Sequence, residues 1–260
     1  MSPLFQTRIT QLFGIRLPVL AGGMQWLSTP DYVAAAAGAG ICGFLTAASY
    51  EELSDLRAAI RRCRDLSEGK PFGVNVSMLP KLVQGERTQG IFDLIIEEGV
   101  RCVETSGRNP APYLPALKAA GVTVVHKVPA VKYALKAQAE GVDAVAVVGA
   151  ECGGHPGMEM VGTMVQANVA AAKLSIPLLV GGGIGTGAHL VAALALTPKW
   201  DWDVAAGWLI ATEAGARVSD HHGRPWAFNR PDPRQASLVC AAPVIQPMIV
   251  RRCKNVPLST

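Results

Sequence analysis

A single histidine stands in a glycine-rich turn that directly follows an apolar segment of strand length. The turn spans residues 149–157 and holds four glycines, Pro156 and His155, and residues 142–148 before it are rich in valine. Such a run is typical of a buried strand. Glycines let the backbone pass close to a bound group, and a proline restricts the chain behind the histidine. We therefore interpret His155 as a candidate base, although an isolated histidine can also cap a helix or lie in solvent.

A second glycine-rich turn has the residues expected of an anion site. Gly181, Gly182 and Gly183 follow an apolar segment and are followed by Ile184-Gly185-Thr186-Gly187 before a helical pattern. Exposed backbone N–H groups and the helix dipole favour an anion at such a place. The turn is too late in the chain for a dinucleotide fingerprint. It is either a phosphate site or simply a tight turn between a strand and a helix.

Two further segments suit a flavin. Met24 and Gln25 follow the first predicted strand, and Lys127 follows the fifth. An amide and backbone N–H groups can hydrogen-bond the polar edge of an isoalloxazine, and a lysine there would stabilise the negative charge of the reduced ring. Lys127 could also be an ordinary surface lysine.

Elements that could position these residues recur in a regular order. A strand followed by a helix appears about eight times, with glycine at several of the helix ends. The predicted strands cover residues 17–21, 41–46, 72–76, 102–107, 122–126, 144–148, 176–180 and 204–206. The predicted helices cover residues 30–37, 50–65, 89–98, 112–120, 129–140, 163–174 and 188–196. Strands that are apolar throughout need helices on both faces or a closed sheet, so the pattern predicts a (β/α)8 TIM barrel.

Polar residues gather where these strands end. They are Gly23, Met24, Gln25, Asn75, Ser77, Glu104, Lys127, His155 and the glycines of residues 181–185. The carboxyl ends of the strands in a TIM barrel form one rim, which carries the chemistry. We therefore expect these residues at a common active-site face.

The composition argues against several other classes of protein. The chain has 260 residues, 17% charged residues and a net charge of +4, with lysine and arginine scattered. We expect neither nucleic acid nor a membrane as partner, and a cytoplasmic location. Six single cysteines indicate reduced thiols in the core, and His221-His222 has no third ligand at metal spacing, so no metal site is expected.

Five ordered motifs resemble the nitronate monooxygenase family, once called 2-nitropropane dioxygenases, which also includes FMN-dependent NADH:quinone reductases. The motifs lie at residues 18–26, 73–75, 103–107, 126–128 and 153–157. The resemblance runs from about residue 5 to residue 196.

The resemblance implies a TIM barrel that binds FMN non-covalently. It places Gly23, Met24, Gln25, Asn75, Ser77, Lys127 and Gly154 around the flavin, and Gly181, Gly182 and Gly183 on its phosphate. His155 matches the family's active-site histidine. The implied reaction is oxidation of small nitronates with O2. The alternative is NAD(P)H:quinone reduction on the same scaffold.

The chain departs from the family after residue 196. The family completes its phosphate site after strand eight with a Gly-Ala-Asp segment and a Met-Gly-Thr-Arg-Phe segment. Here only Gly207 and residues 211–214 match, and the Thr-Arg pair is absent. Beyond residue 214 the helical periodicity is weak. We therefore divide the chain into an FMN-binding barrel, 1–214, and an atypical proline-rich tail, 215–260. A second alternative is a barrel whose catalysis is impaired by these departures.

Overall fold

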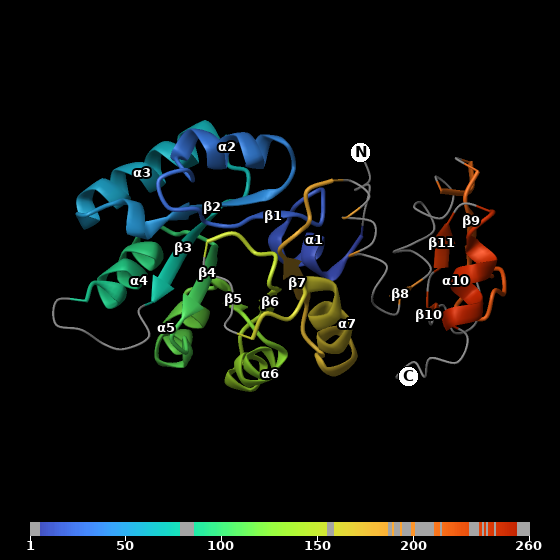
Figure 1. Ribbon diagram of the computed structural model, residues 1–260. Helices are drawn as coiled ribbons and strands as arrows, with labels where there is room; N and C mark the ends of the chain where they lie inside the picture. The colour runs from blue at the N-terminus through green and yellow to red at the C-terminus, as the bar shows by residue number, and fades with distance from the viewer. Residues whose placement is uncertain are drawn as a thin grey trace.

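Seven parallel strands form one curled sheet in the computed structural model, and they lie side by side in the order of the chain (Figure 1). The strands are β1 Leu20–Ala21, β2 Cys42–Thr46, β3 Gly73–Met78, β4 Cys102–Gly107, β5 Thr123–Val128, β6 Ala144–Val148 and β7 Leu178–Gly181. Successive parallel strands with a crossover helix between them are the repeating unit of an α/β barrel. The fold class expected from the sequence is confirmed.

The structure describes most of the barrel and separate stretches after it. The described residues are 6–78, 86–154, 159–186, 189, 193, 199–200, 211–213, 215–228, 234–235, 237, 239–241 and 243–253. The predicted eighth strand, 204–206, lies outside the described residues. Of the predicted helix 188–196, residues 189 and 193 are described, and both are helical.

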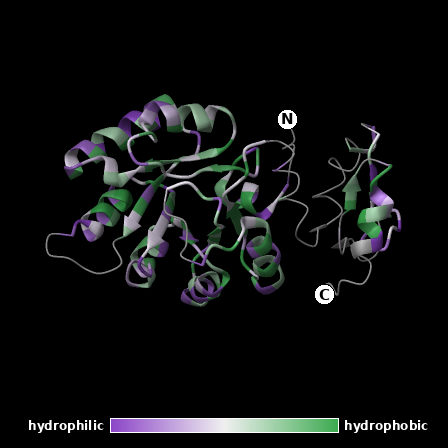
Figure 2. Ribbon diagram, in the orientation of Figure 1, coloured by the Kyte–Doolittle hydropathy of each residue, from purple (hydrophilic) through white to green (hydrophobic). Residues whose placement is uncertain are grey.

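Helices connect the strands around the outside of the sheet. They are α2 Pro30–Gly38, α3 Leu53–Leu66, α4 Thr88–Glu97, α5 Leu114–Ala119, α6 Val131–Glu140 and α7 Thr163–Lys173, with short 3-10 turns η1 Ala47–Ser49 and η2 Ala111–Tyr113. Figure 2 places the hydrophilic residues mainly on these peripheral helices. Their buried faces and the outer face of the sheet form the larger apolar core, which includes Leu45, Val74 and Val103.

The helix ends follow the local signals in the sequence. The side chain of Thr29 accepts a hydrogen bond from the Tyr32 backbone N–H, and Pro30 opens α2. Gly141 ends α6 in the left-handed conformation, with φ of 93°. Both arrangements satisfy backbone groups that a helix end leaves unpaired.

A second apolar cluster fills the inside of the curled sheet. It joins Phe44, Cys102 and Val125 from the strands with Ile9 and Phe13 from α1, Arg8–Phe13. The rings of Phe13 and Phe44 meet edge to face, with centroids 6.4 Å apart. Helix α1, which our sequence analysis did not predict, therefore packs into the interior of the barrel.

The C-terminal region contains more regular structure than the sequence suggested. Its elements are β8 Lys199–Trp200, β9 Arg217–Ser219, β10 Arg234–Gln235, β11 Val239–Ala241 and α10 Gln246–Cys253. Strands β9 and β11 pair antiparallel, and Figure 1 shows them with α10 apart from the parallel sheet. The expectation of little helical structure here was wrong for residues 246–253.

Candidate active site

The inward face of the sheet changes from apolar to polar toward the carboxyl ends of the strands. Side chains alternate between the two faces of a strand, so the residues that follow Phe44, Cys102 and Val125 on the same face are Thr46, Glu104 and Lys127. The strand register brings Thr46, Asn75 and Glu104 into one row. Ser77, Ser106 and Lys127 form the next row.

Glu104 is the centre of this polar cluster. One of its oxygens, Oε2, accepts hydrogen bonds from the Gly23 backbone N–H at 3.1 Å and from Asn75 Nδ2 at 2.5 Å. The Lys127 Nζ atom lies 3.4 Å from the same oxygen. Glu104 is only 6% exposed. A buried carboxylate needs such partners, and this one joins the chain after β1 to strands β3, β4 and β5.

Gly23 fits against Asn75 because it has no side chain. A Cβ at this position would lie 2.3 Å from the Asn75 Cβ and 2.8 Å from the Thr46 Oγ1. The glycine thus allows a close approach of two parts of the chain. Gly23 and Asn75, which were both expected at the rim, lie next to each other there.

Two hydroxyl groups extend the cluster. Ser106 Oγ donates to Ser77 Oγ at 3.2 Å, and Ser77 Oγ donates to Asn75 Oδ1 at 3.3 Å. Within the described part of the chain, the buried hydroxyl of Thr46 has no hydrogen-bond partner. An unpaired buried hydroxyl is costly, so it indicates a place where a bound molecule or water would supply the missing bond.

Lys127 lies inside strand β5, although the sequence suggested that it follows the strand. Its side chain is 27% exposed and points to the same face as Val125. The alternative of an ordinary surface lysine does not describe this position, because the ammonium is paired with a buried carboxylate.

The loop after β1 projects apolar side chains at the rim. Met24 is 41% exposed and Trp26 is 69% exposed. Gln25 donates from Nε2 to the Ala48 carbonyl oxygen at 3.2 Å, and the Trp26 N–H donates to Ser49 Oγ at 2.9 Å. Trp26 has a φ of 68°, which is uncommon for a bulky residue. We had not singled out Trp26, and no local signal in the sequence marks its conformation.

The two glycine-rich turns lie against each other at the ends of β6 and β7. The Gly149 N–H donates to the Gly181 carbonyl oxygen at 3.1 Å. Gly182 has a φ of 110°, and a Cβ there would lie 2.8 Å from the Cys152 backbone nitrogen. Gly183 has a φ of 72°, with Glu151 beside it. The turns expected to carry the base and the phosphate are therefore neighbours in space.

Gly154, like Gly153 and Gly185 of these turns, has no described atom packed against it. Its φ is 81°, and the described residues place no atom within 4 Å of where its Cβ would stand. His155, the candidate base, and Gly207, expected at the phosphate, lie outside the described residues. The structure places the remaining expected residues at the carboxyl ends of β1, β3, β5, β6 and β7, in two groups: one around Glu104 and one at the two glycine-rich turns.

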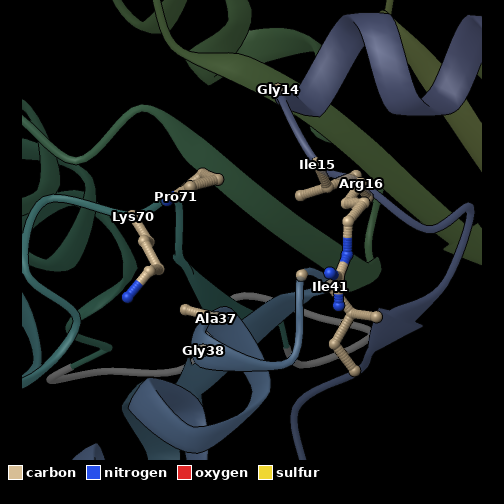
Figure 3. Close-up of a pocket in the computed structure, with 9 residues that line it drawn as sticks. Gly14, Ile15, Arg16, Ala37, Gly38, Ile41, Lys70 and Pro71 are labelled. Carbon is tan, nitrogen blue, oxygen red and sulfur yellow. The ribbon is translucent and has the colours of Figure 1, made fainter. Parts of the chain in front are cut away.

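A surface pocket of about 270 Å³ lies at the opposite end of the strands and is not part of this site. It is lined by Gly14, Ile15, Arg16, Ala37, Gly38, Gly40, Ile41, Lys70 and Pro71 (Figure 3). Ile41 and Pro71 precede β2 and β3, so the pocket opens at the amino ends of the strands. Arg16 donates from Nη2 to the Ala39 carbonyl oxygen at 3.0 Å and so caps the end of α2.

Among the described residues, no group of three or more His, Cys, Asp or Glu side chains could hold a metal ion. In the same part of the chain, no helix is long and apolar enough to cross a bilayer. Cys42, Cys63, Cys102, Cys152 and Cys240 are free thiols, but Cys240 is exposed, so the expectation that all six are core thiols was wrong for this residue.

Residues 6–222 match the family model described as nitronate monooxygenase. A curated relative from Rhodococcus jostii, (3aS,4S,5R,7aS)-5-hydroxy-7a-methyl-1-oxo-octahydro-1H-indene-4-carboxyl-CoA dehydrogenase, is 36% identical over 73% of this chain and 51% of its own length. A probable nitronate monooxygenase from Staphylococcus saprophyticus is 25% identical over 81% of this chain and 70% of its own. The chain therefore spans about half the length of the dehydrogenase relative.

Two solved structures are similar to this one. FabK from Thermotoga maritima superposes with a TM-score of 0.67 at 36% identity, over 74% of this chain and 58% of that chain. Nitroalkane oxidase from Streptomyces ansochromogenes superposes with a TM-score of 0.64 at 25% identity, over 74% of this chain and 65% of that chain. Both matches support the fold described above.

Proposed function

Because this chain belongs to the nitronate monooxygenase family, we propose that it is an FMN-dependent oxidoreductase that oxidises alkyl nitronates with O2. The observation that carries the proposal is the polar cluster around Glu104. It places an amide, a hydroxyl and an ammonium together at the carboxyl ends of neighbouring parallel strands, where barrel enzymes bind their ligands.

The described residues fit FMN. Among the described residues, the buried hydroxyl of Thr46 has no hydrogen-bond partner, and these residues leave space beside Gly154, so a bound molecule could occupy both places. Around the flavin we place Gly23, Met24, Gln25, Asn75, Ser77, Lys127 and Gly154. On its phosphate we place Gly181, Gly182, Gly183 and Gly207. Backbone N–H groups of a glycine turn are common phosphate ligands.

FMN would supply the electron acceptor for the nitronate and the group that O2 reoxidises. The chain's own residues would bind and orient it. Lys127 would hold positive charge near the polar edge of the flavin, and Asn75 would fix that lysine through Glu104. His155 would act as the base, or would donate a hydrogen bond to the nitro group of the substrate.

Titration of the purified protein with FMN, followed by anaerobic mixing with a nitronate, tests this function. We expect a bound-flavin spectrum that bleaches rapidly with the nitronate and returns when O2 is admitted. A His155→Ala variant should keep the bound flavin and lose nitronate turnover. Folded protein that stays colourless in excess FMN would contradict the proposal, as would unchanged turnover in the variant.

A second function on the same scaffold is favoured because the chain is more similar to a carboxyl-CoA dehydrogenase than to the probable nitronate monooxygenase. The relative that is 36% identical acts on a carboxyl-CoA compound, whereas the probable nitronate monooxygenase is 25% identical. The similarity thus favours a reductase or dehydrogenase of a CoA thioester. An NAD(P)H:quinone reductase is the alternative that the family resemblance implies. The same anaerobic experiment separates both alternatives from nitronate oxidation, because NAD(P)H or an acyl-CoA would then bleach the flavin faster than a nitronate. A barrel with impaired catalysis would bind FMN but respond to none of these donors.

A further inference from the structure

Thr163, the first residue of α7, joins three segments next to the two glycine-rich turns. Its backbone N–H and its hydroxyl lie 2.8 Å and 2.9 Å from Glu151 Oε2, an oxygen of the loop after β6. The same hydroxyl lies 3.1 Å from the Gly181 carbonyl oxygen at the end of β7. The helix, the loop and the strand therefore meet at one side chain.

The surrounding glycines fit closely around this threonine, which is 2% exposed. A Cβ at Gly149 would lie 2.2 Å from the Thr163 nitrogen, and a Cβ at Gly182 would lie 2.7 Å from its Oγ1. Gly162 leaves similar room for Glu151, whose Oε1 would stand 3.1 Å from a Cβ there. These three glycines thus allow the contacts between Glu151, Thr163 and β7.

The charge of Glu151 suits its position. The Thr163 backbone N–H stabilises the ionised carboxyl, which lowers the pKa of Glu151. A negative charge at the start of a helix is also favoured by the helix dipole. Among the described residues of these turns, Glu151 is therefore the one acidic group that binds the start of α7. Through Thr163 it is also linked to the end of β7.

The loop that Glu151 holds leads directly to the candidate base. The Cys152 N–H donates to the Gly149 carbonyl oxygen at 3.0 Å, and the Ala150 N–H donates to the Val161 carbonyl oxygen at 2.9 Å. Gly153 and Gly154 follow, and then His155. Two successive glycines are permissive, so the entry to this segment has to be fixed from outside it.

We propose that Glu151 is a positioning residue: through Thr163 it holds the loop 149–154, which immediately precedes the candidate base His155 in the sequence, against the carboxyl end of β7. The consequence for catalysis rests on the function proposed above, whereas the consequence for the loop does not.

Hydrogen exchange on the ligand-free protein tests the structural half. We compare Glu151→Ala and Thr163→Val with Glu159→Ala, a control in the same connection whose carboxylate instead pairs with Lys132 on the surface. Removing a charge-assisted hydrogen bond should speed exchange in residues 149–154 by about tenfold, because the loop opens more often. Glu151→Gln keeps an acceptor oxygen and should fall between Glu151→Ala and the wild type, and Thr163→Ser keeps the hydroxyl and should resemble the wild type.

Steady-state kinetics of the FMN-loaded protein test the catalytic half. Glu151→Ala should lower kcat by about tenfold while KM for the nitronate and Kd for FMN change by less than about threefold, because a misplaced base slows the chemical step more than binding. Thr163→Ser and Glu159→Ala should keep the wild-type kcat. Equal exchange in Glu151→Ala and Glu159→Ala would overturn the proposal, and so would faster exchange with an unchanged kcat.

The two proposals fail in different ways. Protein that binds no FMN would remove the proposed function, yet the exchange comparison would still decide whether Glu151 holds the loop. Normal nitronate turnover with no effect of Glu151→Ala would remove only the positioning role.

Discussion

At the scale of single residues, Glu104 is a buried carboxylate in the candidate site that depends on several hydrogen-bond and charge partners. Three donors from separate segments converge on its Oε2: the Gly23 N–H, the Asn75 amide and the Lys127 ammonium. Removing one partner from a buried charge pair leaves the other without compensation, which costs more than the pair contributes to stability.

We therefore expect Glu104→Ala to lower the free energy of unfolding by about 3 kcal/mol. Urea denaturation followed by circular dichroism measures this change. Glu97→Ala is the matched control, because Glu97 forms a salt bridge with Arg57 at the surface and is 56% exposed. The control should change stability by less than about 1 kcal/mol. Equal effects of the two substitutions would contradict the assigned role of Glu104.

A second residue-scale prediction concerns His126, on the other face of β5. Its Nδ1 lies 2.8 Å from Thr105 Oγ1, and burial lowers the pKa of His126 to about 4. As the pH falls below 6.5, the ordinary pKa of histidine, His126 is therefore protonated in the unfolded chain before it is protonated in the folded chain. The contribution of His126 to the free energy of unfolding is fully present above pH 6.5 and is lost as the pH falls toward the pKa of the folded state.

For this one group, the free energy of unfolding should fall by about 2 kcal/mol between about pH 7.5 and about pH 5. The measurement is urea denaturation at both pH values, with His126→Gln as the comparison. The variant cannot titrate at this position, so its stability should fall less over the same interval by about that amount. Parallel losses in the two proteins would show that His126 does not cause the pH dependence.

At the scale of elements, α1 packs inside the curled sheet and fills part of its interior. Phe13 is 3% exposed and packs on Phe44, while Gln11 of the same helix faces solvent. A short helix of six residues is marginal by itself, so its stability comes from this packing.

Phe13→Ala should destabilise the protein by about 3 to 5 kcal/mol, because it removes a buried ring and leaves a cavity. Gln11→Ala should change stability by less than about 0.5 kcal/mol. Thermal and urea denaturation of the two variants measure the difference. A Phe13→Ala protein as stable as the wild type would mean that α1 is not needed to fill the barrel interior.

At the scale of the whole molecule, we propose that residues 1–214 form the FMN-binding barrel domain and that residues 215–260 form a separate tail. The two described apolar clusters inside and outside the sheet draw on residues 9–179 for their fully buried and partly buried members. In Figure 1, β9, β11 and α10 stand apart from that sheet.

A variant that ends at residue 214 should therefore keep the far-ultraviolet circular dichroism of the barrel and unfold within about 1 kcal/mol of the full chain, as a domain with its own core does. Urea denaturation of both proteins checks this. Cooperative loss of the barrel signal in the shorter chain would refute the proposed division.

The local sequence determined the order of the elements and the strand ends at which most residues of the candidate site lie. Apolar runs predicted each described strand of the barrel, Thr29 and Pro30 marked the start of α2, and Gly141 marked the end of α6. These signals depend on residues close together in the chain. The rim of polar residues followed because the carboxyl ends of parallel strands share one edge.

Only the tertiary structure decided how the site residues are used. The pairing of Glu104 with Gly23 and Asn75, the packing of α1 on Phe44 and the contacts of Thr163 join segments far apart in the sequence. No local pattern encodes which distant backbone a glycine must approach, because that depends on the register and curvature of the sheet. For this reason the sequence identified the residues of the rim but not the hydrogen bonds that hold them.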